Sequence, residues 1–226
     1  MRSCRRMLAG LTSLLLAVGA AAQANLITVE DWSGIAVGTK GIPPTWKSGQ
    51  TWGRPTYDFA VVEDSASKVL RLKSQNDSSA ISKEVNVNVK ETPIFQWRWK
   101  AVTLPKGADS RQKATDDQAL QVYVVFERFP SFYRSRIIGY IWDSAAPEGT
   151  TVKSEKSGLV TYVVLRSGPL NLGKWLTESR NVYDDYRRIY GEEPGEPAKA
   201  VTIAIDSDDT KSSAEGYIGE IIFKKP

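Results

Sequence analysis

The feature that most constrains the fold is a succession of short segments in which apolar and polar residues alternate. Successive side chains of a strand point to opposite faces, so this pattern is typical of strands with one buried face. Asp, Ser and Asn residues of the kind found in turns separate the segments. We therefore predict strands at 57–62, 68–74, 80–89, 93–102, 119–127, 136–142, 159–166, 200–206 and 217–223.

One segment has the spacing of a helix instead. Apolar residues recur at helical intervals over 178–191, Thr177 or Ser179 can cap the start, and Gly191 can end it. The polar segment 103–118 is expected to form a long surface loop. These elements predict an all-β fold: an antiparallel β-sandwich of jelly-roll type with one short helical insertion.

The N-terminus has the composition of a secretory signal. Three arginines within the first six residues precede an apolar run that ends in the small-residue sequence AQA. The run is shorter than the roughly 20 strongly apolar residues of a membrane-spanning helix. We predict a signal peptide at 1–24, a single β-sandwich domain at 25–226, and a periplasmic or secreted protein without a transmembrane segment after cleavage.

Composition excludes several classes of function. Loss of the three arginines with the signal peptide lowers the formal net charge by three, from +4 to +1. A nearly neutral chain argues against a nucleic-acid partner, which favours a concentrated basic surface. The sequence has no histidine, and its one cysteine, Cys4, lies in the predicted signal. Ser-His triads, His-ligated zinc, disulfides and thiolate catalysis are therefore excluded from the predicted mature domain.

Several motifs, in order along the chain, resemble those of a known bacterial family. They are "FQWRWK", "LPKGAD", "DDQALQVYVVF", "GYIW", "RNVYDDYRRIYG" and "IAIDSDDT" followed by "GYIGEIIF". The set resembles the family catalogued as domain of unknown function 3047, over nearly all of the predicted mature chain. This resemblance implies an exported bacterial protein and supplies no activity. The strand order and the closing motif are also similar, in architecture only, to galactose-binding-type carbohydrate-binding jelly rolls, and a fold does not imply a function.

The strand around "WRWK" has a polar face. Trp97 and Trp99 share one side, which we assign to the core, while Arg98 and Lys100 point to the other. Polar and aromatic groups of this kind suit a glycan, because rings stack on sugars while polar groups bond hydroxyls. The alternatives are an ordinary solvated face or a structural ion pair of Arg98. The predicted carbohydrate site consists of Arg98, Lys100, Asp117, Gln121, Tyr123, Tyr140 and Arg166.

Carboxylates follow the strand predicted at 200–206. Asp206, Asp208 and Thr210 offer the hard oxygen ligands that Ca²⁺ prefers, and Asp116 or Asp117 can add another. The segment lacks the glycine and glutamate of an EF-hand loop. The simpler interpretation is a turn in which Asp side chains bond nearby backbone N–H groups. A structural calcium ion at Asp206, Asp208 and Thr210 is the alternative.

Three tryptophans lie in segments rich in proline and glycine. Trp32, Trp46 and Trp52 can serve as sugar platforms, but we expect them to close the open end of the sandwich.

Catalysis by carboxylates has weaker support. The doublets Asp116–Asp117, Asp184–Asp185 and Glu192–Glu193 do not form ready-made pairs, because adjacent side chains diverge on strands and helices. The sequence therefore favours an exported, non-enzymatic β-sandwich that binds carbohydrate or another cell-envelope ligand. The alternatives are a polysaccharide hydrolase or lyase that uses Asp, Glu, Tyr or Arg, and an envelope assembly or scaffold protein.

Overall fold

A computed structural model describes residues 26–49 and 55–226. The predicted signal peptide and Trp52 lie outside the described residues. Within the described ranges, no helix has the length and apolar character needed to cross a bilayer.

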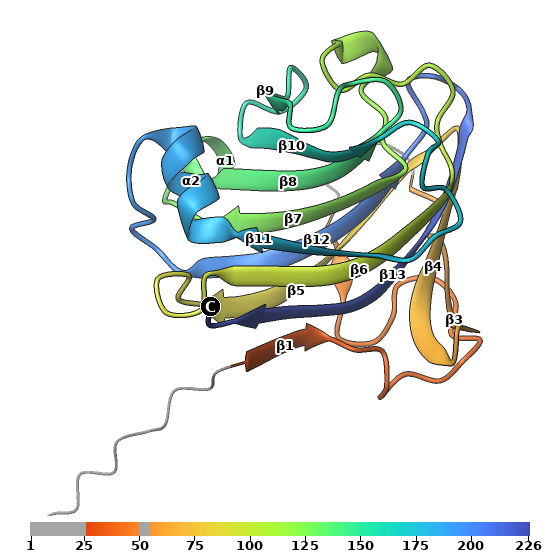
Figure 1. The fold of residues 1–226 in the computed structure, drawn as a ribbon, viewed down its shortest axis with the longest axis horizontal. Helices are drawn as coiled ribbons and strands as arrows, with labels where there is room; N and C mark the ends of the chain where they lie inside the picture. Colours follow the sequence, from red (N-terminus) through yellow and green to blue (C-terminus); the bar gives the residue numbers. More distant parts are fainter. Residues whose placement is uncertain (1–25, 50–54) are drawn as a thin grey trace, which may run out of the picture.

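The strands of the described residues form two sheets (Figure 1). The first sheet has the order β11 (Leu176–Asn181), β6 (Ile94–Thr103), β13 (Ser213–Lys224), β4 (Ser67–Gln75) and β3 (Asp58–Asp64), with β1 (Leu26–Glu30) paired to β13. The second sheet has the order β2 (Lys47–Ser48), β5 (Ser78–Val87), β12 (Ala198–Asp206), β7 (Leu120–Phe126), β8 (Arg136–Asp143), β10 (Val160–Ser167) and β9 (Thr151–Lys153). Each strand predicted from the alternating pattern is present, and the predicted jelly-roll β-sandwich is confirmed.

The strand pairs are antiparallel throughout the described sheets, except that β10 runs parallel to β8. Parallel neighbours need a crossover connection. Here the segment between β8 and β10 makes the crossover, and it contributes β9 to the outer edge of the second sheet. In Figure 1, β9 lies at the top of the second sheet, and α2 (Val182–Tyr190) lies beside the ends of its strands.

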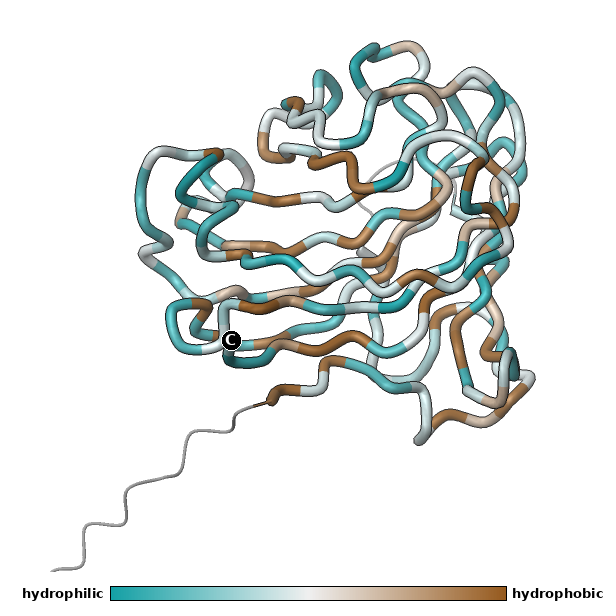
Figure 2. The backbone as a smooth tube through the Cα atoms, viewed as in Figure 1, coloured by the Kyte–Doolittle hydropathy of each residue, from teal (hydrophilic) through white to brown (hydrophobic). Residues whose placement is uncertain are grey.

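The core lies between the two sheets and is rich in aromatic residues. Trp97 and Trp99 of β6 are fully buried, as predicted. The Trp97 ring lies 5.2 Å from Tyr140, and the Trp99 ring lies 5.8 Å from Trp142, both on β8 of the second sheet. Aromatic burial supplies much of the favourable energy of such a core. Hydrophobic segments accordingly recur along the strands of both sheets (Figure 2).

Two of the three loop tryptophans are buried, in agreement with the expectation that they close the sandwich. Trp32 and Trp46 stack with ring centroids 5.8 Å apart. The Trp32 indole N–H donates to the Gly219 carbonyl, and the Trp46 indole N–H donates to the Glu30 carboxylate, each at 2.9 Å.

The predicted helix at 178–191 is wrong in its first part. Residues up to Asn181 form β11, where Glu178 is buried and pairs across the strand with Trp97. A buried carboxylate in this strand hides the alternating pattern, and pairing with β6 overrides the local helical spacing. The helix starts after Asn181, whose side chain caps the Asp184 N–H, and it ends at Gly191 as predicted.

Other elements escaped the sequence prediction because they are very short or lie at sheet edges. They are β1, β2, β9, β11, the helix α1 (Ser131–Arg134) and a 3-10 turn at Lys113–Thr115. The loop predicted at the surface over 103–118 is partly buried instead. Asp109, Asp116 and Asp117 are buried, and the Ser110 N–H donates to Asp143 at the end of β8.

Gly139 on β8 provides a test of the packing outside the core. A Cβ at this position would lie 2.6 Å from the ring of Tyr123 on the neighbouring β7. We expect Gly139→Ala to lower the free energy of unfolding by about 1 to 3 kcal/mol, the usual effect of overpacking. Gly34→Ala is the matched control, because its Cβ would meet nothing within 4 Å. Equal denaturation midpoints for the two variants would contradict this packing.

Candidate ligand-binding site

Helices α1 and α2 lie at the same end of the sandwich, beside the second sheet (Figure 1). Between them and strands β8, β10 and β9, the last three strands of the second sheet, is a groove with a volume of about 810 Å³. We call it the arginine groove. It is lined by Arg128, Tyr133, Arg134, Ser135, Arg136, Thr151, Lys153, Gly158, Leu159, Thr161, Arg188, Ile189 and Tyr190.

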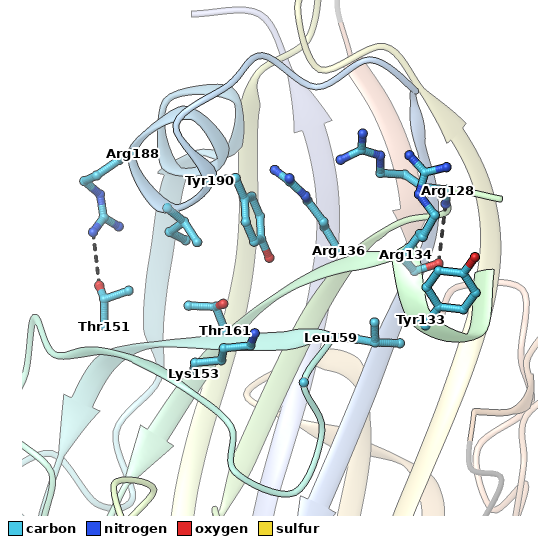
Figure 3. A pocket seen from close by; sticks show the side chains of 13 residues that line it. Arg128, Tyr133, Arg134, Arg136, Thr151, Lys153, Leu159, Thr161, Arg188 and Tyr190 are labelled. Atoms are coloured by element: carbon cyan, nitrogen blue, oxygen red, sulfur yellow. Dashed lines mark hydrogen bonds between the residues drawn. The ribbon is translucent and has the colours of Figure 1, made fainter. Parts of the chain in front are cut away.

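The lining is strongly cationic. Five of these side chains are arginine or lysine, and none of the described residues that line the groove is Asp or Glu. Figure 3 shows Arg188 and Thr151 toward one end and Arg134 toward the other, with Tyr190 and Lys153 between them. The groove therefore offers positively charged donors along its whole length.

Two of the arginines share one carboxylate at the border of the groove. The Glu192 carboxylate forms salt bridges with Arg128 at 2.7 Å and with Arg136 at 2.9 Å. The Arg136 guanidinium also lies over the Tyr190 ring, 4.4 Å from its centroid. Burial raises the pKa of Tyr190 to about 12, so its hydroxyl stays protonated and donates to the Ile137 carbonyl. These contacts fix both side chains in the groove.

A buried carboxylate on α2 positions the arginine at the opposite end. Asp185 accepts hydrogen bonds from Arg180 at 2.6 Å, Arg188 at 2.9 Å and the Tyr140 hydroxyl at 2.9 Å. Burial opposes ionisation of Asp185, but hydrogen bonds from the two arginines outweigh it and lower its pKa. Arg188 also donates to the Thr151 hydroxyl at 3.0 Å, so it spans the groove from α2 to β9.

The remaining two cations have no carboxylate partner within the described residues. Arg134 donates to the Phe129 carbonyl at 3.1 Å, and Lys153 is exposed on β9. Two aromatic side chains stand beside Arg134. Phe129 is 89 % exposed and Tyr133 is 57 % exposed. Large aromatic residues this exposed are typical of surfaces that bind a partner or ligand.

A second hollow of about 600 Å³ adjoins the arginine groove. Arg128 and Arg134 line both, and Phe129, Lys199 and Glu196 line only the second. The two arginines thus separate two contiguous depressions, of which the first is lined by Tyr133 and the second by Phe129.

Comparison with known sequences gives the family. The model of the family described as Protein of unknown function (DUF3047) matches residues 45–222. The chain belongs to this family. No curated protein matches this DUF3047 member.

Solved structures similar to this DUF3047 member include several carbohydrate-binding modules. The family 11 module of the cellulosomal cellulase Lic26A-Cel5E of Clostridium thermocellum has 6 % identity and a TM-score of 0.47, over 89 % of this chain and 95 % of the module. The family 30 module of the cellulosomal cellulase Cel9D-Cel44B of the same organism has 9 % identity and a TM-score of 0.46, over 88 % and 97 %. The K2 cleaved adhesin domain of Lys-gingipain has 9 % identity and a TM-score of 0.45, over 88 % and 99 %.

The predicted carbohydrate-site residues do not share one surface. Arg98 and Lys100 lie on the outer face of the first sheet, where both cations approach the ring of Trp175. Lys100 is also paired with Asp64. Gln121 lies on the outer face of the second sheet. Grouping it with Arg98 was wrong, because β6 and β7 follow one another in the chain but belong to different sheets.

Three other members of that predicted set also have contacts within the fold. The Tyr123 hydroxyl donates a hydrogen bond to the Gln121 side chain, and the Tyr123 ring packs against Gly139. Placing Tyr140 on a binding face was wrong, because its side chain is fully buried between the sheets and donates to Asp185. Arg166 makes a bidentate pair with Glu178, at 2.7 and 3.1 Å, which links the two sheets.

The last of the set, Asp117, lies with the predicted calcium ligands and not with Arg98. It accepts the backbone N–H groups of Asp209 and Thr210, at 3.2 and 2.7 Å, and the Thr210 hydroxyl. The local bond of the simpler interpretation is also present, from the Asp208 N–H to the Asp206 carboxylate at 3.4 Å. The carboxylates of Asp117, Asp208 and Asp209 nevertheless have oxygens within 4.8 Å of one another. Calcium at Asp206, Asp208 and Thr210 stays a prediction.

The turn concentrates negative charge. Burial and the charges of Asp117 and Asp208 raise the pKa of Asp206 to about 9. Burial likewise raises the pKa of Asp116 to about 6. Lys156 supplies a positive charge through its pair with Asp209. A proton on Asp206, or a bound cation, would relieve the remaining repulsion.

The arginine groove is not predicted from the sequence, because its cations come from separate parts of the chain. A local signal was nevertheless present. Residues 128–136 read "RFPSFYRSR", in which three arginines flank three aromatic residues. This composition is unusual for a strand connection and marks one wall of the groove.

The variant Asp206→Asn distinguishes the two interpretations of the acidic turn. Without an ion, the folded protein retains a proton on Asp206 between about pH 4 and pH 9 that the unfolded chain releases, so stability falls as pH rises. The variant should then be more stable than the parent at pH 8 and nearly equal to it at pH 4. If calcium binds, the variant should instead lose the increase in melting temperature that calcium gives the parent. Glu220→Gln, at an exposed carboxyl group, is the control.

Asp185→Asn tests the buried anchor of α2. Removing the charge leaves Arg180 and Arg188 without their buried partner, which should cost about 3 to 5 kcal/mol at pH 7. Since the pKa of Asp185 is lowered in the fold, this stabilisation should disappear as pH falls below the ordinary value of 3.8. Asp184→Asn, at the exposed neighbour on the same helix, should leave the urea midpoint unchanged. Equal losses in the two variants would contradict the role of Asp185.

Proposed function

We propose that this protein is an exported, non-enzymatic carbohydrate-binding protein and that its glycan occupies the arginine groove. The observation that carries the proposal is the pair of exposed aromatic side chains, Phe129 and Tyr133, beside an open groove lined with hydrogen-bond donors. Glycans present both apolar C–H faces and hydroxyl groups, and this combination of ring and donors matches both.

The groove also has a suitable size and polarity. A volume of about 810 Å³ falls within the range of small-ligand sites, about 300 to 1,000 Å³. The guanidinium groups of Arg134 and Arg188 and the hydroxyl of Thr151 can donate to sugar oxygens. The adjoining hollow, reached across Arg128, would allow a chain longer than one or two sugar units to continue past the groove.

Two features of the groove favour binding of the glycan without its hydrolysis. Glycoside hydrolysis uses a pair of carboxyl groups beside the scissile bond. The described lining supplies cations and hydroxyl groups instead, and Tyr190 has too high a pKa to act as a base near neutral pH. Export to the periplasm or the medium, with a cell-envelope glycan as partner, rests on the basic and apolar pattern of residues 1–24.

The exposed side chains of Phe129 and Tyr133 allow a direct test of glycan binding in the groove. In a glycan array followed by isothermal titration calorimetry, Tyr133→Ala and Phe129→Ala should each weaken binding about tenfold, which corresponds to about 1.4 kcal/mol. Both side chains are exposed, so the melting temperature should stay close to that of the parent. Leu170→Ala, which removes an exposed apolar side chain from the loop between β10 and β11, is the matched control. Unchanged affinity in both aromatic variants, or absence of any glycan ligand, would refute the proposal.

A further inference from the structure

We infer that the arginine groove selects acidic glycans: polymers whose sugar units carry carboxylate, sulfate or phosphate groups. This inference rests on the proposed carbohydrate binding and specifies its ligand class. The charge of the groove and the way its cations are paired carry it.

Positive charge exceeds negative charge at the groove. Six cations belong to it or to its anchor: Arg128, Arg134, Arg136, Lys153, Arg180 and Arg188. Among the described residues, two carboxylates contact them, and each is shared. Glu192 serves Arg128 and Arg136, and Asp185 serves Arg180 and Arg188. The predicted mature chain has a net charge of only +1, so this excess is local to the groove.

Two cations of the groove lie outside these clusters. Arg134, on α1, and Lys153, on β9, have no ion pair within the described residues. Both are exposed side chains, and they enter the groove from different walls (Figure 3). A ligand that met both would place anionic groups at separated positions, as a polymer of acidic sugars does.

The hydrogen-bond donors of the groove are suited to anionic groups. The planar guanidinium matches carboxylate, sulfate and phosphate oxygens with two parallel hydrogen bonds, which makes arginine the preferred side chain for such anions. A neutral sugar can accept single hydrogen bonds but cannot offset the repulsion among the clustered cations. An acidic sugar can do both, so the groove should discriminate by charge among glycans of equal shape.

Matched pairs of polysaccharides test this discrimination directly. Polygalacturonate, alginate and hyaluronan would each be compared with the same polymer after reduction of its carboxyl groups to alcohols. This treatment keeps the linkages and removes the charge. We expect at least one acidic polymer to bind tenfold or more tightly than its reduced form in affinity electrophoresis. We also expect this difference to shrink between 50 and 500 mM NaCl, because salt screens charges at an exposed site.

Variants locate the effect in the groove. The double variant Arg134→Gln, Lys153→Gln should lose tenfold or more affinity for the acidic polymer and keep the parent melting temperature, because both side chains are exposed. The matched control is Arg187→Gln, Lys106→Gln, which removes the same charge from exposed positions. The Arg187 guanidinium lies over Tyr183 on α2, and Lys106 is in the loop that leads to β7. The control should bind like the parent.

The possible outcomes separate this inference from the proposed function. Equal binding of the acidic and reduced forms, or preference for a neutral glycan, would overturn acidic selectivity and leave carbohydrate binding intact. No binding to any acidic or neutral polysaccharide would overturn both. Equal losses in the two double variants would overturn the assignment to the groove. Binding of a DNA duplex as tightly as the acidic polymer would overturn selectivity for glycans, because the groove would then recognise any polyanion.

Discussion

The carboxylate of Asp185 connects the core of the sandwich to the surface where the groove lies. It accepts from Tyr140, between the sheets, from Arg180 on the first sheet, and from Arg188 at the groove. A buried charge is tolerated only when its hydrogen-bonding capacity is well satisfied. That requirement fixes α2 in one position against both sheets. The orientation of Arg188, and with it one end of the groove, therefore depends on a group inside the protein.

A related arrangement closes the sandwich at its side. Glu178 on the first sheet accepts from Trp99 in the core and from Arg166 on the second sheet. Asp117 in turn holds the turn after β12. In each case a buried carboxylate joins segments that are distant in the chain. The sequence suggested a ligand-binding role for Asp117 because aspartate occurs in both structural and functional sites, and only its partners distinguish the two.

Features set by neighbouring residues could be predicted from the sequence, and features set by pairing between distant segments could not. Alternation along β6 and β7 is local, and on β6 it correctly placed Trp97 and Trp99 in the core. Assignment of those strands to sheets depends on long-range pairing, which explains why Arg98 and Gln121 were wrongly expected to be neighbours. The groove was missed for the same reason, since its walls come from residues 128–136, 151–161 and 188–190. A parallel pair between β8 and β10 brings these segments together, and no local pattern encodes it.

The side chains that give the groove its charge have one consequence for how the protein can work. Guanidinium and ammonium groups lose their protons only under strongly alkaline conditions. A recognition surface built from them, in a chain without imidazole, has no built-in means of release as its surroundings acidify or become more alkaline. A ligand held there would leave only through competition, through dilution, or through loss of its own ionised groups. For the proposed glycan binding, this chemistry favours lasting attachment over release driven by pH.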